Sequence, residues 1–181
     1  MKIEDTPLPG VLLLTPVIYR DERGAFFESY NERELAAAGL PTVWPQDNFS
    51  LSKKNVVRGL HYQITQPQGK LVRVTHGAVL DVVVDLRRSS PAFGRHLAVE
   101  LSGENGRMLW IPPGFGHGFA VLSEEAGFAY KVTDYYSPAG ERTILWNDPS
   151  LAITWPVSAE QAIVSNKDRN GARLAQAEVF A

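Results

Sequence analysis

The chain has 181 residues and contains no cysteine. This absence excludes disulfide bonds, thiolate zinc sites, iron–sulfur clusters and cysteine nucleophiles. No stretch approaches the ~18 to 20 consecutive apolar residues of a membrane-spanning helix, and the first residues contain no apolar run of signal-peptide length. We therefore expect a soluble, cytoplasmic protein that has no membrane partner.

An excess of charge of either sign is also lacking. The 18 basic and 20 acidic residues leave a formal net charge of −2. Because the broad basic surface typical of nucleic-acid-binding proteins is missing, we expect no nucleic-acid partner. The hydrophobic content of 44% is that of a globular protein. At ~150 residues per domain, a single domain over residues 1–181 is the expectation.

Short apolar segments rich in Val, Ile, Tyr, Phe and Trp recur about every ten residues, which predicts an all-β sandwich, jelly roll or barrel. One short helix is predicted in the N-terminal half, with Asn31 as its N-cap, Glu34 completing a capping box and Gly39 ending it. The segments predicted as strands are 11–19, 26–30, 56–63, 70–75, 79–86, 96–101, 108–111, 118–122, 128–133 and 143–146.

Three charged residues share strand faces with valines. Alternation puts Asp81 and Asp85 on one face with two valines, and buried acids need partners, so we interpret them as hydrogen-bonded at a barrel mouth or an edge. Lys70 also shares a face with two valines. It either snorkels outward or meets a partner in a pocket, and composition alone favours snorkelling.

The segment Arg58-Gly59-Leu60-His61-Tyr62-Gln63 combines a cation with a histidine. Strict alternation puts Arg58 and His61 on opposite faces of a strand, whereas a bulge at Gly59 brings them to one side. From this segment alone, a surface arginine and a core histidine are the simpler interpretation.

A second histidine ends the run Pro112-Pro113-Gly114-Phe115-Gly116-His117, which follows Gly106. This spacing resembles the second motif of cupins, in which prolines and glycines aim a histidine into a barrel. Metal-binding cupins carry a first motif with two histidines at i and i+2, and the four histidines of this chain include no such pair. A firm metal site needs three or more ligands, so we expect no metal.

Two further polar segments are ambiguous by themselves. The run from Tyr130 to Tyr136 reads as a strand whose aromatic hydroxyls reach water. The run Ser165-Asn166-Lys167-Asp168 reads as a polar loop.

Taken together, the segments of this chain resemble the dTDP-4-dehydrorhamnose 3,5-epimerase family, a metal-free branch of the cupins. The resemblance covers nearly the whole chain in order. It implies a cupin-like jelly-roll β-barrel, a C-terminal segment that closes the pocket, no cofactor, and a homodimer whose N-terminal strands extend the partner's sheet. The matching segments are DERG-x-F-x-E at 21–28, QDN at 46–48, RGLHYQ at 58–63, QGKLVRV at 68–74, DVVVDLR at 81–87, SPAFG at 90–94, IPPGFGHGF at 111–119, YKVTDYYSP at 130–138, WNDP at 146–149 and SNKD at 165–168.

Members of that family convert dTDP-4-dehydro-6-deoxy-D-glucose into dTDP-4-dehydro-β-L-rhamnose, in dTDP-L-rhamnose biosynthesis for surface polysaccharides. The C4 ketone acidifies the protons at C3 and C5. A base removes each proton to give an enolate, and an acid returns a proton on the opposite face. The resemblance implies four catalytic residues, with His61 as the base, Asp168 as the carboxylate that orients it, Lys70 as the cation facing the enolate oxygen, and Tyr130 as the acid.

The resemblance also implies a set of substrate contacts. Arg23, Arg58 and Lys167 match residues that hold the diphosphate or the sugar, because cations suit phosphate oxygens. Tyr136 matches an aromatic residue that stacks on thymine, and Phe26 matches one that lines the pocket. The remaining nucleotide or sugar contacts match Glu28, Gln46, Asp47, Asn48, His117 and Glu141.

One departure from the family pattern keeps an alternative open. The loop between His61 and Lys70 is one residue shorter than usual in the family. A shift of the sugar there would give a single-site epimerase, acting at C3 or C5 of a related dTDP-4-keto-6-deoxy sugar. A non-catalytic cupin that binds a nucleotide sugar is a further alternative, against which the four catalytic matches argue.

Overall fold

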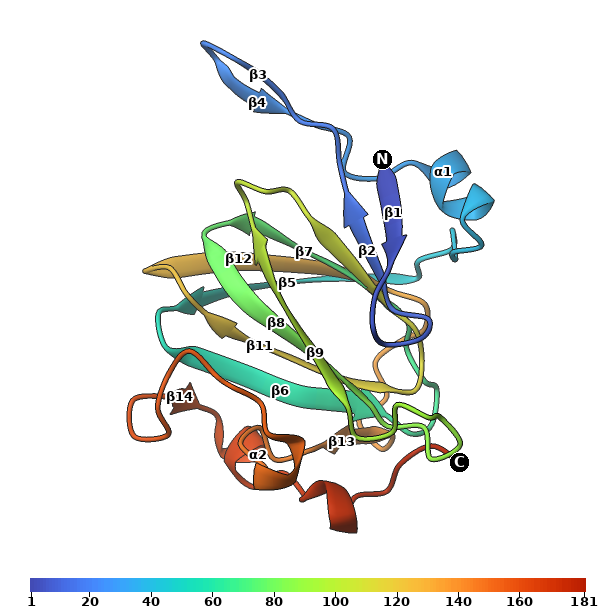
Figure 1. Cartoon of the computed structure of the whole chain (residues 1–181), viewed down its shortest axis with the longest axis vertical. Coiled ribbons are helices and arrows are strands. Elements are labelled where there is room, and N and C mark those ends of the chain that lie inside the picture. The colour runs from blue at the N-terminus through green and yellow to red at the C-terminus, as the bar shows by residue number, and fades with distance from the viewer.

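The computed structural model describes all residues, 1–181, and its main feature is a pair of β-sheets that face each other (Figure 1). The first sheet has the strand order β1-β2-β10-β7-β12-β5, with all pairs antiparallel. Its strands are β1 (Lys2–Asp5), β2 (Leu12–Thr15), β10 (Met108–Ile111), β7 (Lys70–His76), β12 (Glu125–Val132) and β5 (Gln46–Lys53).

The second sheet has the order β13-β6-β11-β8-β9, and a further strand, β14, pairs with β6 in parallel. The two sheets are not closed into one hydrogen-bonded barrel, but the all-β, cupin-like jelly roll is confirmed. The strands are β13 (Glu141–Thr143), β6 (Val56–Gln63), β11 (Phe115–Val121), β8 (Ala78–Asp85), β9 (His96–Ser102) and β14 (Ile163–Val164).

Apolar side chains from both sheets fill the space between them. The largest buried cluster includes Val72 of β7, Val83 of β8, Phe119 of β11 and Phe128 of β12. The opposite face of β8 is buried as well, because Val82 packs in a second cluster beneath the C-terminal segment. The valine-rich strand β8 is thus buried on both faces and lies at the centre of the molecule, with Asp81 and Asp85 as its only charged residues.

The N-terminal region contains the predicted helix. Helix α1 (Glu32–Ala37) begins after Asn31, whose side chain accepts hydrogen bonds from the Arg33 and Glu34 backbone amides. The capping box is incomplete, because the Glu34 carboxylate pairs with the N-terminal amine at 3.0 Å and not with the Asn31 amide. Gly39, with φ +72°, follows the helix as predicted.

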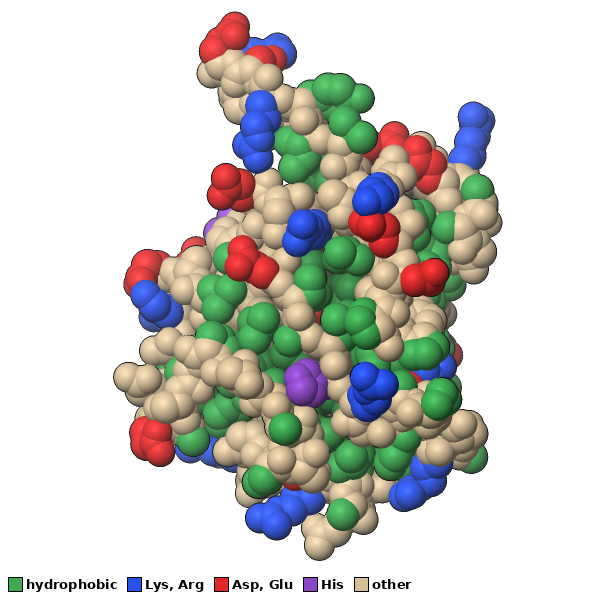
Figure 2. All heavy atoms as spheres, in the orientation of Figure 1, with side chains coloured by type: hydrophobic (Ala, Val, Ile, Leu, Met, Phe, Trp, Pro, Cys, Tyr) green, Lys and Arg blue, Asp and Glu red, His purple; other side chains and the backbone are tan.

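A two-stranded hairpin, formed by β3 (Tyr19–Asp21) and β4 (Gly24–Phe26), projects away from both sheets (Figure 1). Figure 2 shows that the tip of this projection carries acidic and basic side chains. Tyr19 and Phe26 on it are 65% and 71% exposed. The predicted strand 26–30 is therefore wrong beyond Phe26, and the predicted strand 11–19 is divided after Thr15, where Pro16 lacks the amide that a ladder needs.

The sequence reading also missed strand β5, at one edge of the first sheet. Its polar residues hid the alternation, since Asn48, Ser50 and Ser52 point inward and the exposed Phe49 and Leu51 point outward. This reversed pattern indicates that β5 borders a polar cavity.

The C-terminal region folds back against β6 (Figure 1). Its short helices are η1 (Pro149–Leu151), α2 (Asn166–Arg169) and η2 (Leu174–Gln176). No helix in the structure combines the length and the apolar character that crossing a membrane requires.

Candidate active site

A β-bulge in strand β6 brings Arg58 and His61 to the same side of the sheet. His61 lies opposite His117 of β11, whereas Arg58 lies opposite Phe119, so β6 has one extra residue between the two pairs. Gly59 makes the bulge possible, because its φ is +111° and a Cβ atom there would lie 2.6 Å from the Gly118 Cα atom. The bulge that the sequence left as one of two alternatives is confirmed.

Both side chains face a cavity of about 300 Å³ between the two sheets. This volume is at the lower end of the range for small-molecule sites. Strands of both sheets and helix α2 contribute to its wall. The residues that line it are Asn48, Phe49, Ser50, Arg58, His61, Lys70, His117, Gly118, Phe119, Phe128, Tyr130, Glu141 and Lys167.

His61 is held by Asp168, which lies 107 residues later in the chain. The distance from His61 Nε2 to Asp168 Oδ1 is 2.5 Å, and Asp168 is 2% exposed. Asp168 Oδ2 accepts a hydrogen bond from the Gly59 amide at 3.2 Å. Ser165 caps helix α2 by accepting from the Asp168 amide. Each carboxylate oxygen of Asp168 thus has a partner, and the backbone of Asp168 is held as well.

Burial governs the protonation of this pair. It lowers the pKa of His61, and the hydrogen bond and charge of Asp168 oppose this without reversing it. Burial acts to raise the pKa of Asp168, but hydrogen bonds from His61, Gly59 and Ser165 outweigh it and hold the pKa below its usual value. At neutral pH the pair is therefore a neutral imidazole beside a carboxylate, which is the form a general base needs.

Lys70 lines the cavity, so the snorkelling interpretation is wrong. Burial lowers the pKa of its ammonium group to about 8, while Glu141 and Asp81 act to raise it and Lys167 to lower it. A lysine in this environment is still charged at neutral pH but close to its titration point.

Tyr130 and Arg58 lie on another part of the cavity wall. Burial raises the pKa of the Tyr130 phenol, and the nearby Arg58 charge opposes this in part. The phenol is therefore protonated at neutral pH and can donate a proton. Arg58 Nε donates to Ser52 Oγ at 3.0 Å, which leaves the outer nitrogens of the guanidinium group for other partners.

A polar chain borders the opening of the cavity. Lys167 Nζ lies 2.8 Å from Glu141 Oε1, and the Tyr136 hydroxyl donates to Glu141 Oε2 at 3.1 Å. The Tyr136 amide donates to Gln46 Oε1 at 3.0 Å, and Gln46 Nε2 donates to Asn48 Oδ1 at 2.8 Å. These five residues come from three separate segments of the chain, and they form one connected group beside the cavity.

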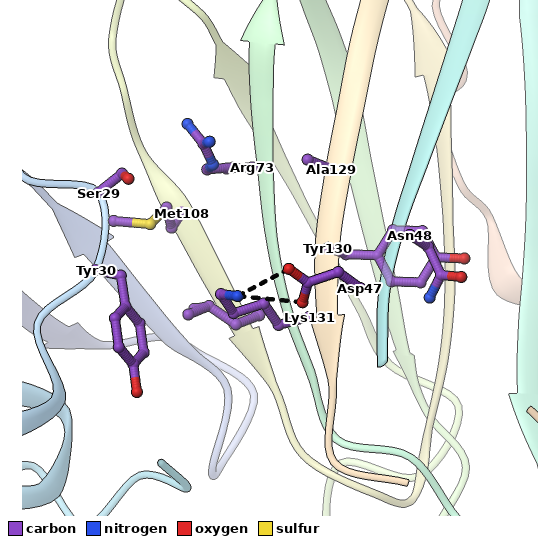
Figure 3. A pocket seen from close by; sticks show the side chains of 10 residues that line it. Ser29, Tyr30, Asp47, Asn48, Arg73, Met108, Ala129, Tyr130 and Lys131 are labelled. Atoms are coloured by element: carbon purple, nitrogen blue, oxygen red, sulfur yellow. Dashed lines mark hydrogen bonds and ion pairs between the residues drawn. The ribbon is translucent and has the colours of Figure 1, made fainter. Parts of the chain in front are cut away.

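Six residues matched to substrate contacts do not line this cavity. Gln46 and Tyr136 belong to the connected group beside it, and the other four lie elsewhere. Asp47 points to the other side of β5, into a neighbouring hollow that shares Asn48 and Tyr130 with the cavity, and it pairs there with Lys131 at 2.9 and 3.1 Å (Figure 3). Arg23 and Phe26 lie on the projecting hairpin, and Arg23 pairs there with Asp21. Glu28 accepts from Asn31 near the start of helix α1.

The second cavity histidine, His117, has an acidic partner that sequence reasoning did not assign to it. His117 Nε2 lies 2.9 Å from Asp81 Oδ2. The signal was present in the alternation of strand 79–86, which put an acid among inward-facing valines. Asp85, the other acid of that face, binds Arg87 and Ser90 instead. No group of three His, Asp or Glu side chains lies close enough together to hold a metal ion.

Comparisons with known proteins agree on one family. Residues 5–176 match the family model of dTDP-4-dehydrorhamnose 3,5-epimerase. The Pseudomonas aeruginosa protein of that name is 53% identical over 99% of each chain. A dTDP-6-deoxy-D-glucose-3,5-epimerase from Legionella pneumophila, solved in complex with dTDP-4-keto-L-rhamnose, is 50% identical, with a TM-score of 0.92 over 98% of this chain and 94% of that one.

A 3′-monoepimerase from Streptomyces bikiniensis, solved with dTDP-quinovose, is also similar. It is 34% identical, with a TM-score of 0.87 over 94% of this chain and 86% of that one. The 3,5-epimerases are more similar to this chain, at 53% and 50% identity, than the monoepimerase is. The family model also matches almost the whole chain. The chain therefore belongs to the dTDP-4-dehydrorhamnose 3,5-epimerase family.

Proposed function

We propose that this chain epimerises C3 and C5 of dTDP-4-dehydro-6-deoxy-D-glucose to give dTDP-4-dehydro-β-L-rhamnose, with residues 1–181 acting as one domain. The observation that carries the proposal is the His61–Asp168 pair, which faces the same cavity as Lys70 and Tyr130. The cavity thus holds a base, a cation and an acid, the three groups that proton transfer next to a ketone requires.

His61 is the base in this mechanism. Its lowered pKa keeps the ring neutral at neutral pH, so Nδ1 or Nε2 can accept a proton from carbon. Since Asp168 Oδ1 occupies the side of Nε2, Nδ1 is the nitrogen left for the substrate. Asp168 orients the ring and stabilises the imidazolium that forms when the proton is taken.

Lys70 stabilises the enolate. Removing a proton from C3 or C5 transfers negative charge to the C4 oxygen. A fixed ammonium group facing that oxygen in a largely buried cavity can contribute several kcal/mol, of the order of ~3 to 4 for one oxyanion donor. Lys70 makes no ion pair within 4.0 Å, so its charge is left for this oxygen.

Tyr130 returns the proton on the face opposite to the base. Inversion requires a donor on that face, and the protonated phenol of Tyr130 supplies one. Arg58 beside it favours the transient phenolate, because a nearby positive charge lowers the cost of losing the proton. Arg58 and Lys167 also supply cations for the diphosphate, and Tyr136 at the cavity opening supplies a ring for thymine.

Proton exchange in D₂O tests the function directly. Proton NMR of dTDP-4-dehydro-6-deoxyglucose with the enzyme follows deuterium at each carbon, and reduction of the product then identifies its stereochemistry. Deuterium at both C3 and C5 with an L-rhamno product is expected. Exchange and inversion at one carbon only would replace the proposal with a single-site epimerase, the activity named for the Streptomyces bikiniensis relative. The loop at 64–69 would then be the place to seek the cause.

We further propose that the active protein is a homodimer. Tyr19 and Phe26 on the projecting hairpin and Phe49 and Leu51 on edge strand β5 are more than half exposed, which is costly for large apolar side chains. The proposed contacts of Arg23, Phe26, Glu28 and Asp47 with substrate need a second chain, because these residues lie outside the cavity of their own chain. Sedimentation velocity is expected to give twice the monomer mass of 20.0 kDa, and a monomer mass would reject the dimer. A cytoplasmic location and a role in surface polysaccharide synthesis stay predictions.

A further inference from the structure

Gln63 carries a buried amide side chain that the proposed chemistry does not use. It ends strand β6, two residues after His61, and it is 5% exposed without lining the cavity. Burial of an amide costs free energy unless its donors and its acceptor find partners. Both polar atoms of the Gln63 side chain are bonded to backbone groups. These bonds indicate which parts of the chain Gln63 holds together.

The Gln63 amide joins two loops that are far apart in the sequence. Its Nε2 atom donates to the Gln66 carbonyl at 2.7 Å and to the Tyr135 carbonyl at 3.3 Å, and its Oε1 atom accepts from the Ser137 amide at 2.9 Å. The first contact lies in the loop between β6 and β7, and the other two lie on either side of Tyr136. Only this orientation of the amide fits, since two carbonyls need the nitrogen and an amide needs the oxygen.

Other hydrogen bonds join the same two loops on both sides of this contact. Gln68 Nε2 donates to the Asp134 carbonyl at 2.8 Å. The Ile64 amide donates to the Gly140 carbonyl at 2.9 Å. The loop between β6 and β7 is thus bound along its length to the segment that carries Tyr136, and it is not a free lid over the cavity.

The catalytic side chains are held in a different way from Tyr136. Lys70 lies between β10 and β12 in the first sheet, and His61 lies between β11 and β13 in the second. Tyr136 belongs to no strand, and its side chain is more than half exposed. Its own amide bonds to Gln46, and the backbone on each side of it bonds to Gln63. Loss of the Gln63 amide should therefore disturb Tyr136 and leave the proton-transfer groups in place.

We propose that Gln63 is a positioning residue for nucleotide recognition, which fixes the backbone on both sides of Tyr136 so that the ring is in place before dTDP binds. The proposal rests on the function given above, in which Tyr136 supplies a ring for thymine. A ring that is already ordered binds more tightly, because less conformational freedom is lost on binding. An amide suits this role, since a single group supplies two donors and an acceptor to three backbone partners.

A double-mutant cycle of Gln63→Met and Tyr136→Ala tests the proposal, with dTDP binding measured by isothermal titration calorimetry. Methionine has a similar length and no charge, but it cannot replace the three hydrogen bonds. Gln63→Met is expected to weaken dTDP binding by about fivefold, as for a misplaced aromatic contact. In the Tyr136→Ala background the same substitution is expected to leave dTDP affinity unchanged, because the ring through which Gln63 acts is gone. Gln63→Asn, whose amide is one methylene shorter, replaces Gln63→Met if that variant does not fold, with the same expectation.

Asn105→Leu is the matched control. The Asn105 side chain also bonds to three backbone groups, because it accepts from the Ser102 and Arg107 amides and donates to the Glu100 carbonyl. It does not line the cavity, so Asn105→Leu is expected to lower the melting temperature and to leave dTDP affinity unchanged. For epimerisation by Gln63→Met, KM is expected to rise by the same factor as the dTDP Kd, with kcat little changed. A substitution that only destabilised the fold would not produce this division between KM and kcat.

Unchanged dTDP affinity in the folded Gln63 variant would overturn the inference. Equal weakening by Gln63→Met in both backgrounds would do so as well, as would wild-type affinity in Tyr136→Ala or an equal effect of Asn105→Leu. Because dTDP binding requires no proton transfer, the cycle separates this inference from the proposed function. A wild-type chain that exchanges no protons but shows the expected coupling would reject epimerisation and keep the role of Gln63. Exchange at both carbons without the coupling would do the reverse.

Discussion

Two histidine–aspartate pairs lie side by side in this molecule, and they are built in opposite ways. His61 and His117 are register partners on adjacent strands. The His61 side chain is 27% exposed and its acid has every oxygen bonded, whereas the His117 side chain is 9% exposed and its acid has one oxygen free. The first pair presents a ring nitrogen to the cavity, whereas the second pair is almost completely enclosed by the fold.

The origin of the two acids explains this difference. Asp81 comes from β8, the strand next to β11, so the sheet itself fixes the His117 pair. Asp168 comes from helix α2, which is held near His61 by the parallel pairing of β14 with β6 before it and by a bridge from Ala172 to Ile144 after it. The His61–Asp168 pair thus depends on the C-terminal segment that folds back over the sheet. A substitution in this pair can therefore change the site without altering the core.

The largest expected effect comes from removing the imidazole of His61 while that of His117 is kept. His61→Ala is expected to reduce deuterium incorporation at C3 and C5 by about 10³-fold or more, because general-base catalysis is lost. His117→Ala, the matched variant on the neighbouring strand, is expected to retain exchange at both carbons and to bind substrate more weakly. Proton NMR in D₂O measures both. Exchange that persists in His61→Ala would assign the base elsewhere.

A loss of similar or smaller size is expected from Asp168→Asn. The amide keeps the shape but can turn a donor toward His61, so the ring loses its orientation and the imidazolium loses its counter-charge. We expect kcat to fall by about 10²-fold to 10⁴-fold, with dTDP affinity little changed. Asp148→Asn is the control, because Asp148 is also buried in the C-terminal region but binds Ser150 and Leu174. An equal fall of kcat in Asp148→Asn would mean that both substitutions act only by destabilising the C-terminal region.

Tyr130→Phe tests the face opposite to His61. Deuterium exchange at C3 and C5 by the base is expected to continue, while inversion falls by about tenfold to 10²-fold, most clearly at C5, because the proton donor is missing. Tyr62→Phe is the matched control, since its hydroxyl is also part-buried but donates to the Glu178 carbonyl, away from the cavity. Product stereochemistry and rate equal to wild type would reject Tyr130 as the acid.

Much of the fold followed from the sequence, because alternation and valine-rich runs reflect burial directly. Strand β8 is an example. The bulge at Gly59 was only one of two alternatives, because strict alternation favoured the other. Strand β5 escaped because its inward face is polar, a pattern that reads as loop until a cavity is known to lie beside it. The alternation of apolar and polar residues thus fails to predict a strand whose inward side chains border a polar cavity and not the apolar core.

The site was less accessible to such reasoning. No spacing rule connects His61 to Asp168 across 107 residues, and only the family resemblance put them together. Local pattern also misjudged Lys70, because a lysine among valines on one strand gives no indication of what the facing sheet contributes. The positions of Arg23 and Phe26 depend on a hairpin that contacts little of its own chain, so no single-chain argument could place them in a site.

The smallest expected effect is a shift in the pH profile of kcat/KM. The acid limb of kcat/KM reports the pKa of His61, which burial has lowered, so this limb should lie below the ordinary histidine value of ~6.5. The charge of Asp168 raises that pKa, so Asp168→Asn should move the acid limb to still lower pH while the maximal rate falls. The alkaline limb should report Lys70, whose pKa burial lowers to about 8, and Asp168→Asn should leave that limb in place. An acid limb that moves upward in Asp168→Asn would contradict the role of Asp168 as the counter-charge of His61, because loss of a negative neighbour can only disfavour the imidazolium.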